Sequence, residues 1–151
     1  MDEQDRKICE ILQQNGRASS AEIAKQIGVS VSTANERVRK LVASGAIRGF
    51  RAVVDPDAAR AGFCCHVFID MAYDGEEDAI KALCARPEVM ELHHISGAHS
   101  YLAKVRVANA DAMQEFLQHV VKPMKAIERT ETLFSLYVAK ESTEVLIQPN
   151  S

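Results

Sequence analysis

The sequence predicts an α+β protein with two domains, an N-terminal winged helix-turn-helix over residues 1–54 and a C-terminal βαββαβ ferredoxin-like sandwich over residues 60–151. Two observations predict this fold class. Three short patterns with helical spacing follow one another in the first 45 residues, and a glycine separates the second from the third. After residue 60, strand-like and helix-like patterns follow in the order strand, helix, strand, strand, helix, strand.

The first two helices have recognisable ends. The first is expected to stop at the Asn15-Gly16 pair, and its apolar positions recur at helical spacing at Ile8, Ile11 and Leu12. In the second, Ser19 and Glu22 have the spacing of a capping box, and Gly28 is expected to end the helix. Its apolar face consists of Ile23 and Ile27. A short turn that contains this glycine then leads to a third helix, which is typical of a helix-turn-helix.

The third helix is expected to start after Ser30, a candidate N-cap, and to end at Gly45. The stripe expected to be buried consists of Val31, Ala34, Val38, Leu41 and Val42. At about 100° per residue, the opposite face carries Thr33, Glu36 and Lys40, flanked by Ser32, Arg37 and Arg39. Hydroxyls and Arg can meet phosphates or base edges in a major groove, and Glu can accept from a cytosine amine. The alternative for an isolated helix is a solvated face without a ligand.

Residues 46–56, AIRGFRAVVDP, alternate apolar and polar positions around a glycine. This pattern predicts a short strand pair, or wing, before a linker at Asp55-Pro56. Arg48 and Arg51 are then candidates for phosphate contacts, or else ordinary exposed strand residues. The DNA-binding set that we expect is Ser30, Ser32, Thr33, Glu36, Arg37, Arg39, Lys40 and Arg48.

The charge distribution separates the two halves. Residues 1–54 carry nine Lys and Arg against six Asp and Glu, whereas residues 55–151 carry nine against fifteen. A basic segment joined to an acidic remainder indicates a polyanion-binding module with a partner or regulatory module. The four cysteines lack C-x-x-C spacing, which favours free thiols in a reducing compartment. Because neither a signal peptide nor a membrane span is recognisable, we expect a cytoplasmic protein with no membrane contact.

The second half alternates between two periods. Strands are expected over residues 62–73, 88–96, 100–108 and 129–140. Helices are expected over residues 75–87, with Ile80, Leu83 and Cys84 inward, and over residues 109–123, with a stripe of Met113, Phe116, Leu117, Val120 and Val121. This order gives a four-stranded antiparallel sheet with both helices on one face. The uncovered face includes apolar positions, which predicts a homodimer and two recognition helices on a pseudo-palindromic DNA site.

A histidine-rich hairpin, LHHISGAHSYLAKV, occupies residues 92–105. Neighbouring strand residues point to opposite faces, so His93 and His94 cannot both face one metal ion, and the Cys64–His66 run has the same difficulty. A catalytic site would need Ser100 with His99 or His94, and no acidic residue or nucleophile elbow accompanies them. We therefore expect no catalytic residue, no metal and no cofactor, and hence no enzyme.

Several motifs resemble the Lrp/AsnC (feast/famine, leucine-responsive regulator) family of transcription regulators. They are MDEQDRKI, NGRASSAEIAKQIGVS, ERVRKLVASGAIRGFRAVVDP, PEVMELHHISGAHSYLAKVRV and IERTETLFSLYV, and together they span nearly the whole chain. The resemblance implies a RAM-type C-terminal domain that forms dimers, dimers that assemble into octamers, and a free amino acid bound between dimers near the glycine hairpin. Its implied effector-binding residues are His94, Gly97, Ala98, Ser100, Tyr101, Thr130 and Thr132.

One position departs from the family pattern. Ser100 stands where the family has an aspartate, and a serine offers an ammonium group no negative charge. A charge-assisted hydrogen bond is roughly twice as strong as a neutral one. We therefore expect weaker binding of simple amino acids, a different ligand, or assembly without a ligand. The function expected overall is a sequence-specific, amino-acid-responsive regulator of transcription on double-stranded DNA; the alternative is an architectural, DNA-wrapping protein without an effector.

Overall fold

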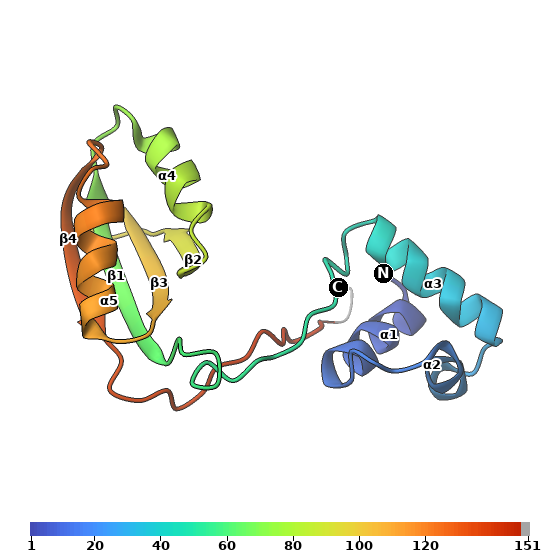
Figure 1. The fold of residues 1–151 in the computed structure, drawn as a ribbon. Coiled ribbons are helices and arrows are strands. Elements are labelled where there is room, and N and C mark those ends of the chain that lie inside the picture. Colours follow the sequence, from blue (N-terminus) through green and yellow to red (C-terminus); the bar gives the residue numbers. More distant parts are fainter. Residues whose placement is uncertain (149–151) are drawn as a thin grey trace. The chain divides into compact units, whose positions relative to one another are not determined.

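The computed structural model describes residues 1–148, which form two compact units. One unit contains residues 1–53 together with the C-terminal segment from Glu141, and the other contains residues 54–140. The first unit is built from the helices α1 (Glu3–Gln14), α2 (Ser20–Ile27) and α3 (Val31–Ala43) (Figure 1). The helix-turn-helix predicted from the sequence is thus present.

Side-chain caps define the starts of these three helices. Ser19 and Glu22 form the predicted capping box, in which the Ser19 N–H donates to Glu22 Oε2 at 2.6 Å and the Glu22 N–H donates to Ser19 Oγ at 3.2 Å. Gly28 ends α2 with a φ of 70°, a left-handed conformation that suits glycine. Ser30 caps α3 by accepting from the Thr33 N–H at 3.1 Å. These local signals confirm the predicted helix boundaries.

The core of the N-terminal unit comes from one face of each helix. Its buried residues are Ile8, Cys9, Ile11, Ile23, Ala24, Ala34 and Leu41. Two members of the stripe predicted on α3 are not buried, because Val31 is 52% exposed and Val42 is 43% exposed. They stand at the two ends of the helix, where α1 and α2 do not cover them. The buried stripe of α3 is therefore narrower than predicted.

The wing predicted over residues 46–56 differs from the structure. Residues 46–62, all of them described, contain no strand, although Ile47 packs against the N-terminal core. A strand pair needs two segments that can bond to each other, and Val53, whose side chain is 98% exposed, has no covering surface. Residues 48–55 form an irregular linker that leads into a turn at residues 56–60, and Arg48 and Arg51 lie exposed on it.

The C-terminal unit has the predicted βαββαβ order. Its elements are β1 (Phe63–Met71), α4 (Glu76–Cys84), β2 (Val89–His94), β3 (Tyr101–Val107), α5 (Ala110–Phe116), which continues as the π-helical turn η1 (Leu117–Val121), and β4 (Ile127–Phe134). The strands pair in the antiparallel order β2-β3-β1-β4 (Figure 1). The last strand ends at Phe134, six positions before the end predicted for it.

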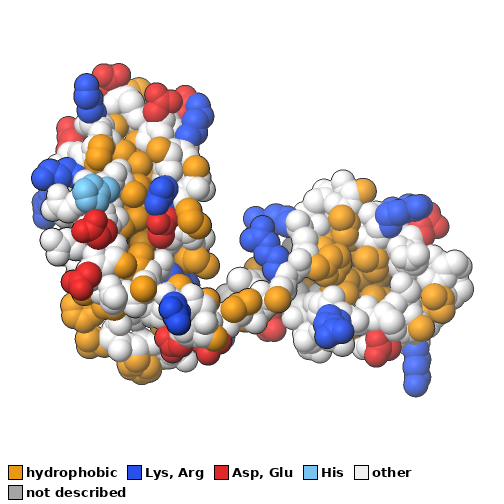
Figure 2. Space-filling model, viewed as in Figure 1, with side chains coloured by type: hydrophobic (Ala, Val, Ile, Leu, Met, Phe, Trp, Pro, Cys, Tyr) orange, Lys and Arg blue, Asp and Glu red, His pale blue; other side chains and the backbone are white. Residues whose placement is uncertain are grey.

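Both helices of this unit pack on one face of the sheet. The core joins Val67 and Ile69 of β1 with Leu83 of α4 and Phe116 of α5. Cys84, predicted to point inward, is exposed, and Ala79 takes the buried position instead. On the other face lie the alternate residues of the strands, which include His66, Phe68, Leu102, Lys104, Glu131 and Leu133. Figure 2 shows hydrophobic side chains exposed among charged ones on both units.

The C-terminal segment does not follow the domain boundary expected from the sequence. Residues 141–148 group with the N-terminal helices rather than with the sandwich, to which the sequence assigned residues 60–151. Ile147 packs against the N-terminal core, and Gln13 of α1 bonds to the backbone of Val145. The last residues of that expected domain, 149–151, lie outside the described residues.

Candidate DNA-binding surface and effector site

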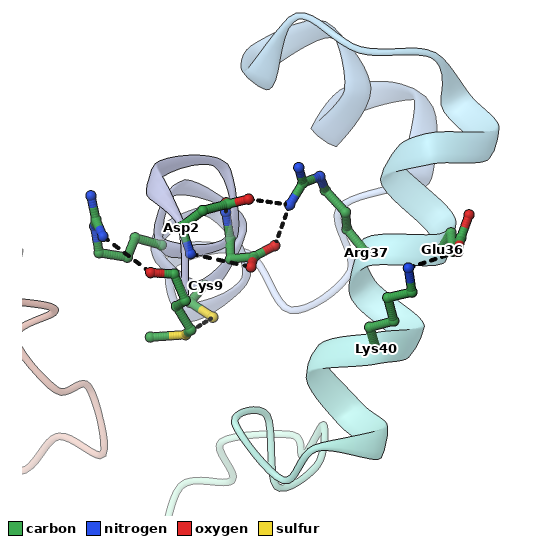
Figure 3. A network of polar contacts seen from close by, with 8 residues as sticks. Asp2, Cys9, Glu36, Arg37 and Lys40 are labelled. Atoms are coloured by element: carbon green, nitrogen blue, oxygen red, sulfur yellow. Dashed lines mark hydrogen bonds and ion pairs between the residues drawn. The ribbon is translucent and has the colours of Figure 1, made fainter. Parts of the chain in front are cut away.

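The outward face of α3 presents hydroxyl, acidic and basic side chains to solvent. Ser32, Thr33, Glu36, Arg39 and Lys40 are all exposed. Lys40 Nζ lies 2.9 Å from Glu36 Oε1, one helical turn away (Figure 3). The hydrogen bond from Lys40 lowers the pKa of Glu36, and the charges of Lys40 and Arg39 add to the effect. Glu36 is therefore a carboxylate at neutral pH and offers only acceptors.

Three hydroxyl groups meet at the start of α3. Ser30 Oγ lies 2.9 Å from Ser32 Oγ and 2.8 Å from Thr33 Oγ1, while it also caps the helix. All three residues are exposed, and Ser30 differs from the other two because its hydroxyl is committed to capping the helix. The N-terminal N–H groups of a helix favour anionic partners such as phosphate.

Arg37, which was expected to contact DNA, instead forms ion pairs within the protein. Its Nη1 lies 2.8 Å from Asp2 Oδ2 and 2.7 Å from Asp5 Oδ1, at the start of α1 (Figure 3). Hydrogen bonds with the Asp5 backbone and the Arg37 side chain lower the pKa of Asp2, and the two carboxylates raise the pKa of Arg37. Arg37 therefore fastens α3 to α1. The residues that hold it, Asp2 and Asp5, were not singled out from the sequence, although their capping-box spacing is visible in it.

The predicted effector hairpin is exposed and tightly turned. Gly97 has a φ of 126°, a conformation that side chains rarely adopt, and its neighbour Ala98 is exposed. Ser100 bonds back to β1, because its N–H donates to the Ile69 carbonyl at 3.1 Å and its Oγ accepts from the Met71 N–H at 3.5 Å. The Ser100 hydroxyl is thus held partly by the sheet backbone.

His94 and Tyr101 lie next to each other on the strands that flank the hairpin. Their rings stack with centroids 4.8 Å apart. Tyr101 is only 7% exposed, and burial, followed by a hydrogen bond with Glu76, raises the pKa of its phenol. Tyr101 therefore anchors the hairpin to the start of α4. Glu76 is a second partner that the sequence did not reveal, because α4 is far from β3 along the chain.

The two threonines lie on another part of the sheet. Thr130 pairs with Ile69, which in turn pairs with Tyr101, so β1 separates Thr130 from the hairpin strands. Two strand spacings amount to about 10 Å. Thr132 lines a cavity of about 270 Å³ between α5 and β4, together with Phe63, Met113 and Phe134. One chain thus brings His94, Gly97, Ala98, Ser100 and Tyr101 together and leaves the threonines apart from them.

His99 holds the hairpin on the sheet face that the helices leave uncovered. Its Nδ1 lies 3.1 Å from Asp70 Oδ1 on β1, and its Nε2 lies 3.7 Å from Glu131 Oε2 on β4. Its ring also contacts Phe68, with centroids 4.9 Å apart. His99 was considered from the sequence as a metal ligand or catalytic base, and its position as an anchor was missed. Asp70 and Glu131 were not singled out as partners of His99, because the strand pairing that brings them close to it is not visible in the sequence.

The described part of the chain contains neither a metal-binding cluster nor a helix that could cross a membrane. Within residues 1–148, no group of three or more His, Cys, Asp or Glu side chains is arranged to hold a metal ion. Among the helices in the same range, none has the length and apolar character needed to cross a membrane.

Comparison with known proteins matches both units. Residues 1–48 match a family model described as winged helix-turn-helix DNA-binding, and residues 64–145 match one described as the Lrp/AsnC ligand binding domain. The chain is 32% identical to the HTH-type transcriptional regulator FL11 of Pyrococcus horikoshii, over 98% of this chain and 97% of that protein. It is 31% identical to the leucine-responsive regulatory protein of Escherichia coli, over 98% of this chain and 92% of that protein.

Solved structures show the same relationship. Escherichia coli AsnC has a TM-score of 0.86 and 33% identity, with coverage of 95% of this chain and 97% of that one. A transcriptional regulator from Neisseria meningitidis, solved as an L-Met complex, has a TM-score of 0.90 and covers 97% of this chain and 96% of its own; at 24% identity it shows the fold alone. No comparison supports the architectural alternative. The sequence matches, the helix-turn-helix and the βαββαβ sandwich together show that this chain belongs to the Lrp/AsnC family of transcription regulators.

Proposed function

We propose that the exposed face of α3 enters the major groove of its DNA site. Ser32 and Thr33 contact phosphates at the helix N-terminus, Glu36 and Lys40 face base edges, and Arg39 reaches the backbone. The observation that carries this assignment is the exposure of all five side chains on one helix whose other face is buried. Arg48 contributes a phosphate contact from the linker, where it is exposed.

Two of the expected DNA contacts take indirect roles in this proposal. Arg37 is engaged by Asp2 and Asp5, so it orients α3 rather than touching DNA. Ser30 caps α3 and positions the hydroxyls of Ser32 and Thr33. Both residues therefore support the recognition surface through bonds within the protein.

The regulator acts as a homodimer, and dimers assemble further, up to an octamer. The uncovered sheet face supports this, because Phe68, Leu102 and Leu133 lie on it without helices over them. A two-fold pair of α3 helices then reads a pseudo-palindromic site. We also propose that the protein works in the cytoplasm, because a transcription regulator acts where it can reach DNA.

The effector is an amino acid or a related small molecule that binds between subunits. The hairpin supplies the backbone N–H groups of Gly97 and Ala98 for a carboxylate and the Ser100 hydroxyl for the ammonium group, and His94 and Tyr101 flank it. Thr130 and Thr132 are about two strand spacings away in one chain, which supports a site completed by a second copy. An effector that binds one assembly more tightly than another shifts the protein toward that assembly. The resulting change in DNA affinity is limited by the ratio of the effector's affinities for the two assemblies.

DNA affinity tests the α3 assignment. Lys40→Ala is compared with Lys25→Ala, which removes an exposed lysine on α2. Each protein is titrated against a natural promoter fragment and an unrelated fragment of equal length at the same salt concentration. We expect Lys40→Ala to lower the ratio of the two affinities by about tenfold and Lys25→Ala to leave it unchanged. An unchanged ratio for Lys40→Ala contradicts the assignment.

A thermal-shift screen of the twenty amino acids tests the effector site. The screen is run on the wild type and on Ser100→Asp, which supplies the carboxylate that the family has at this position. We expect Ser100→Asp to give the larger shifts, because a charged acceptor binds an ammonium group more strongly than a hydroxyl does. If neither protein responds to any amino acid, the effector proposal is wrong.

A further inference from the structure

The C-terminal segment is attached to the first helix of the DNA-binding unit by a pair of hydrogen bonds. The Gln13 Nε2 group donates to the Val145 carbonyl at 3.0 Å. In return, the Val145 N–H donates to Gln13 Oε1 at 2.7 Å. One glutamine side chain thus satisfies both backbone groups of one residue, in the way that a neighbouring strand would.

An apolar contact accompanies these hydrogen bonds. Ile147, two residues further along, packs against the core that α1, α2 and α3 form. The side chains of Val145 and Leu146 point away, since they are 68% and 83% exposed. Ile147 is therefore the one apolar anchor among residues 145–147, and Gln13 fixes the backbone beside it.

The attachment has a consequence because of where this segment comes from. β4, which carries Thr130 and Thr132, ends at Phe134, and residues 135–140 connect it to Glu141. A connection of this length spans about 25 Å at full extension. The DNA-binding unit is thus joined to the effector-binding unit twice, by the linker that follows α3 and by the segment that follows β4.

We propose that residues 141–148 are a strap: they dock on α1 of their own chain, and DNA affinity depends on this docking. Docking restricts how the DNA-binding unit moves relative to the end of β4, and restriction before binding reduces the entropy lost when two recognition helices engage one DNA site. The part of this proposal that concerns DNA rests on the function proposed above. The docking itself is measured without DNA.

Hydrogen exchange in the full-length protein measures the docking. Gln13→Leu removes both hydrogen bonds, and Gln14→Leu makes the same change at the adjacent, exposed position. We expect Gln13→Leu to increase the exchange rate of the Val145 amide by about tenfold, with no increase for Gln14→Leu. A second pair, Ile147→Asn and the exposed Leu146→Asn, tests the apolar anchor with the same expected difference. Wild-type exchange in Gln13→Leu and Ile147→Asn overturns the proposal, whatever the protein does with DNA.

The same variants are then titrated with DNA. We expect Gln13→Leu and Ile147→Asn to weaken binding severalfold, while Gln14→Leu and Leu146→Asn bind as the wild type does. Faster exchange with unchanged DNA affinity means that the segment docks without controlling binding, which overturns the strap. A failure of the α3 assignment gives another pattern, in which Lys40→Ala binds normally and the exchange results stand.

A heterodimer distinguishes docking within one chain from docking on a partner. One subunit carries Gln13→Leu and an intact C-terminal segment, and the other ends at Lys140 and keeps Gln13. Docking on the same chain leaves the only remaining segment unprotected from exchange. If that segment is protected, it has docked on the other subunit, and the assignment to its own chain is wrong.

Discussion

The backbone conformation of Gly97 predicts that replacing this residue lowers the stability of the protein, which can be measured without a ligand or DNA. A Cβ atom added at Gly97 meets no heavy atom within 4 Å, so Gly97→Ala causes no collision. The cost comes from the φ of 126°, which an alanine adopts only with strain. Strain of this kind costs about 1–3 kcal/mol, and we expect the free energy of unfolding of the C-terminal unit to fall by that amount.

Urea denaturation of the full-length protein, followed by circular dichroism, measures this change. The matched control is Gly16→Ala, since Gly16 is also exposed, does not have a left-handed φ, and would bring its Cβ no closer than 3.7 Å to the Leu12 carbonyl. We expect the control to retain wild-type stability or to gain up to about 1 kcal/mol. If Gly97→Ala unfolds at the same urea concentration as the wild type, the hairpin does not hold residue 97 at a positive φ.

Two further predictions concern the C-terminal unit. Leu83→Ala should lower the free energy of unfolding by about 2–5 kcal/mol, because Leu83 is 1% exposed. Cys84→Ser, at the exposed neighbouring position, should change it by less than about 0.5 kcal/mol. Equal effects of the two substitutions in urea denaturation would contradict the assigned buried face of α4. The hydrogen bonds from Arg86 lower the pKa of Glu88, so their contribution is present above the ordinary pKa of 4.5 and is lost as the pH falls through the lowered value. Glu88→Gln should therefore reduce stability by less than about 1 kcal/mol at neutral pH and should match the wild type in strong acid; a difference that persists in acid would exclude this pair as its cause.

The elements that the sequence predicted well are those with local causes. The caps at Ser19 and Ser30 and the left-handed Gly28 depend on neighbours within three or four residues, so their spacing is visible in the sequence. The order of strands and helices along the chain follows from the alternation of strand-like and helix-like patterns. The departures lie at Val31, Val42 and Cys84, where burial depends on which neighbouring element covers each end of a helix.

Contacts between distant parts of the chain could not be predicted from the sequence. In the sequence, Arg37 occupies a position on the third helix that suits a DNA-binding arginine. Only the fold shows that Asp2 and Asp5 engage it. His99 looked like one of three similar histidines until the register of β1 and β4 placed two carboxylates beside it. The Gln13–Val145 contact joins residues from opposite ends of the chain, so no local sequence pattern predicts it.

The salt dependence of DNA binding tests the central claim most directly. Each phosphate contact contributes about 0.9 to the slope of log K against log salt. If Arg39, which is exposed on α3, contacts the phosphate backbone in both subunits of a dimer, Arg39→Ala should reduce the slope by about 1.8. Lys25→Ala should leave the slope at the wild-type value. An Arg39→Ala slope equal to that of the wild type would show that the outward face of α3 is not where this protein meets DNA.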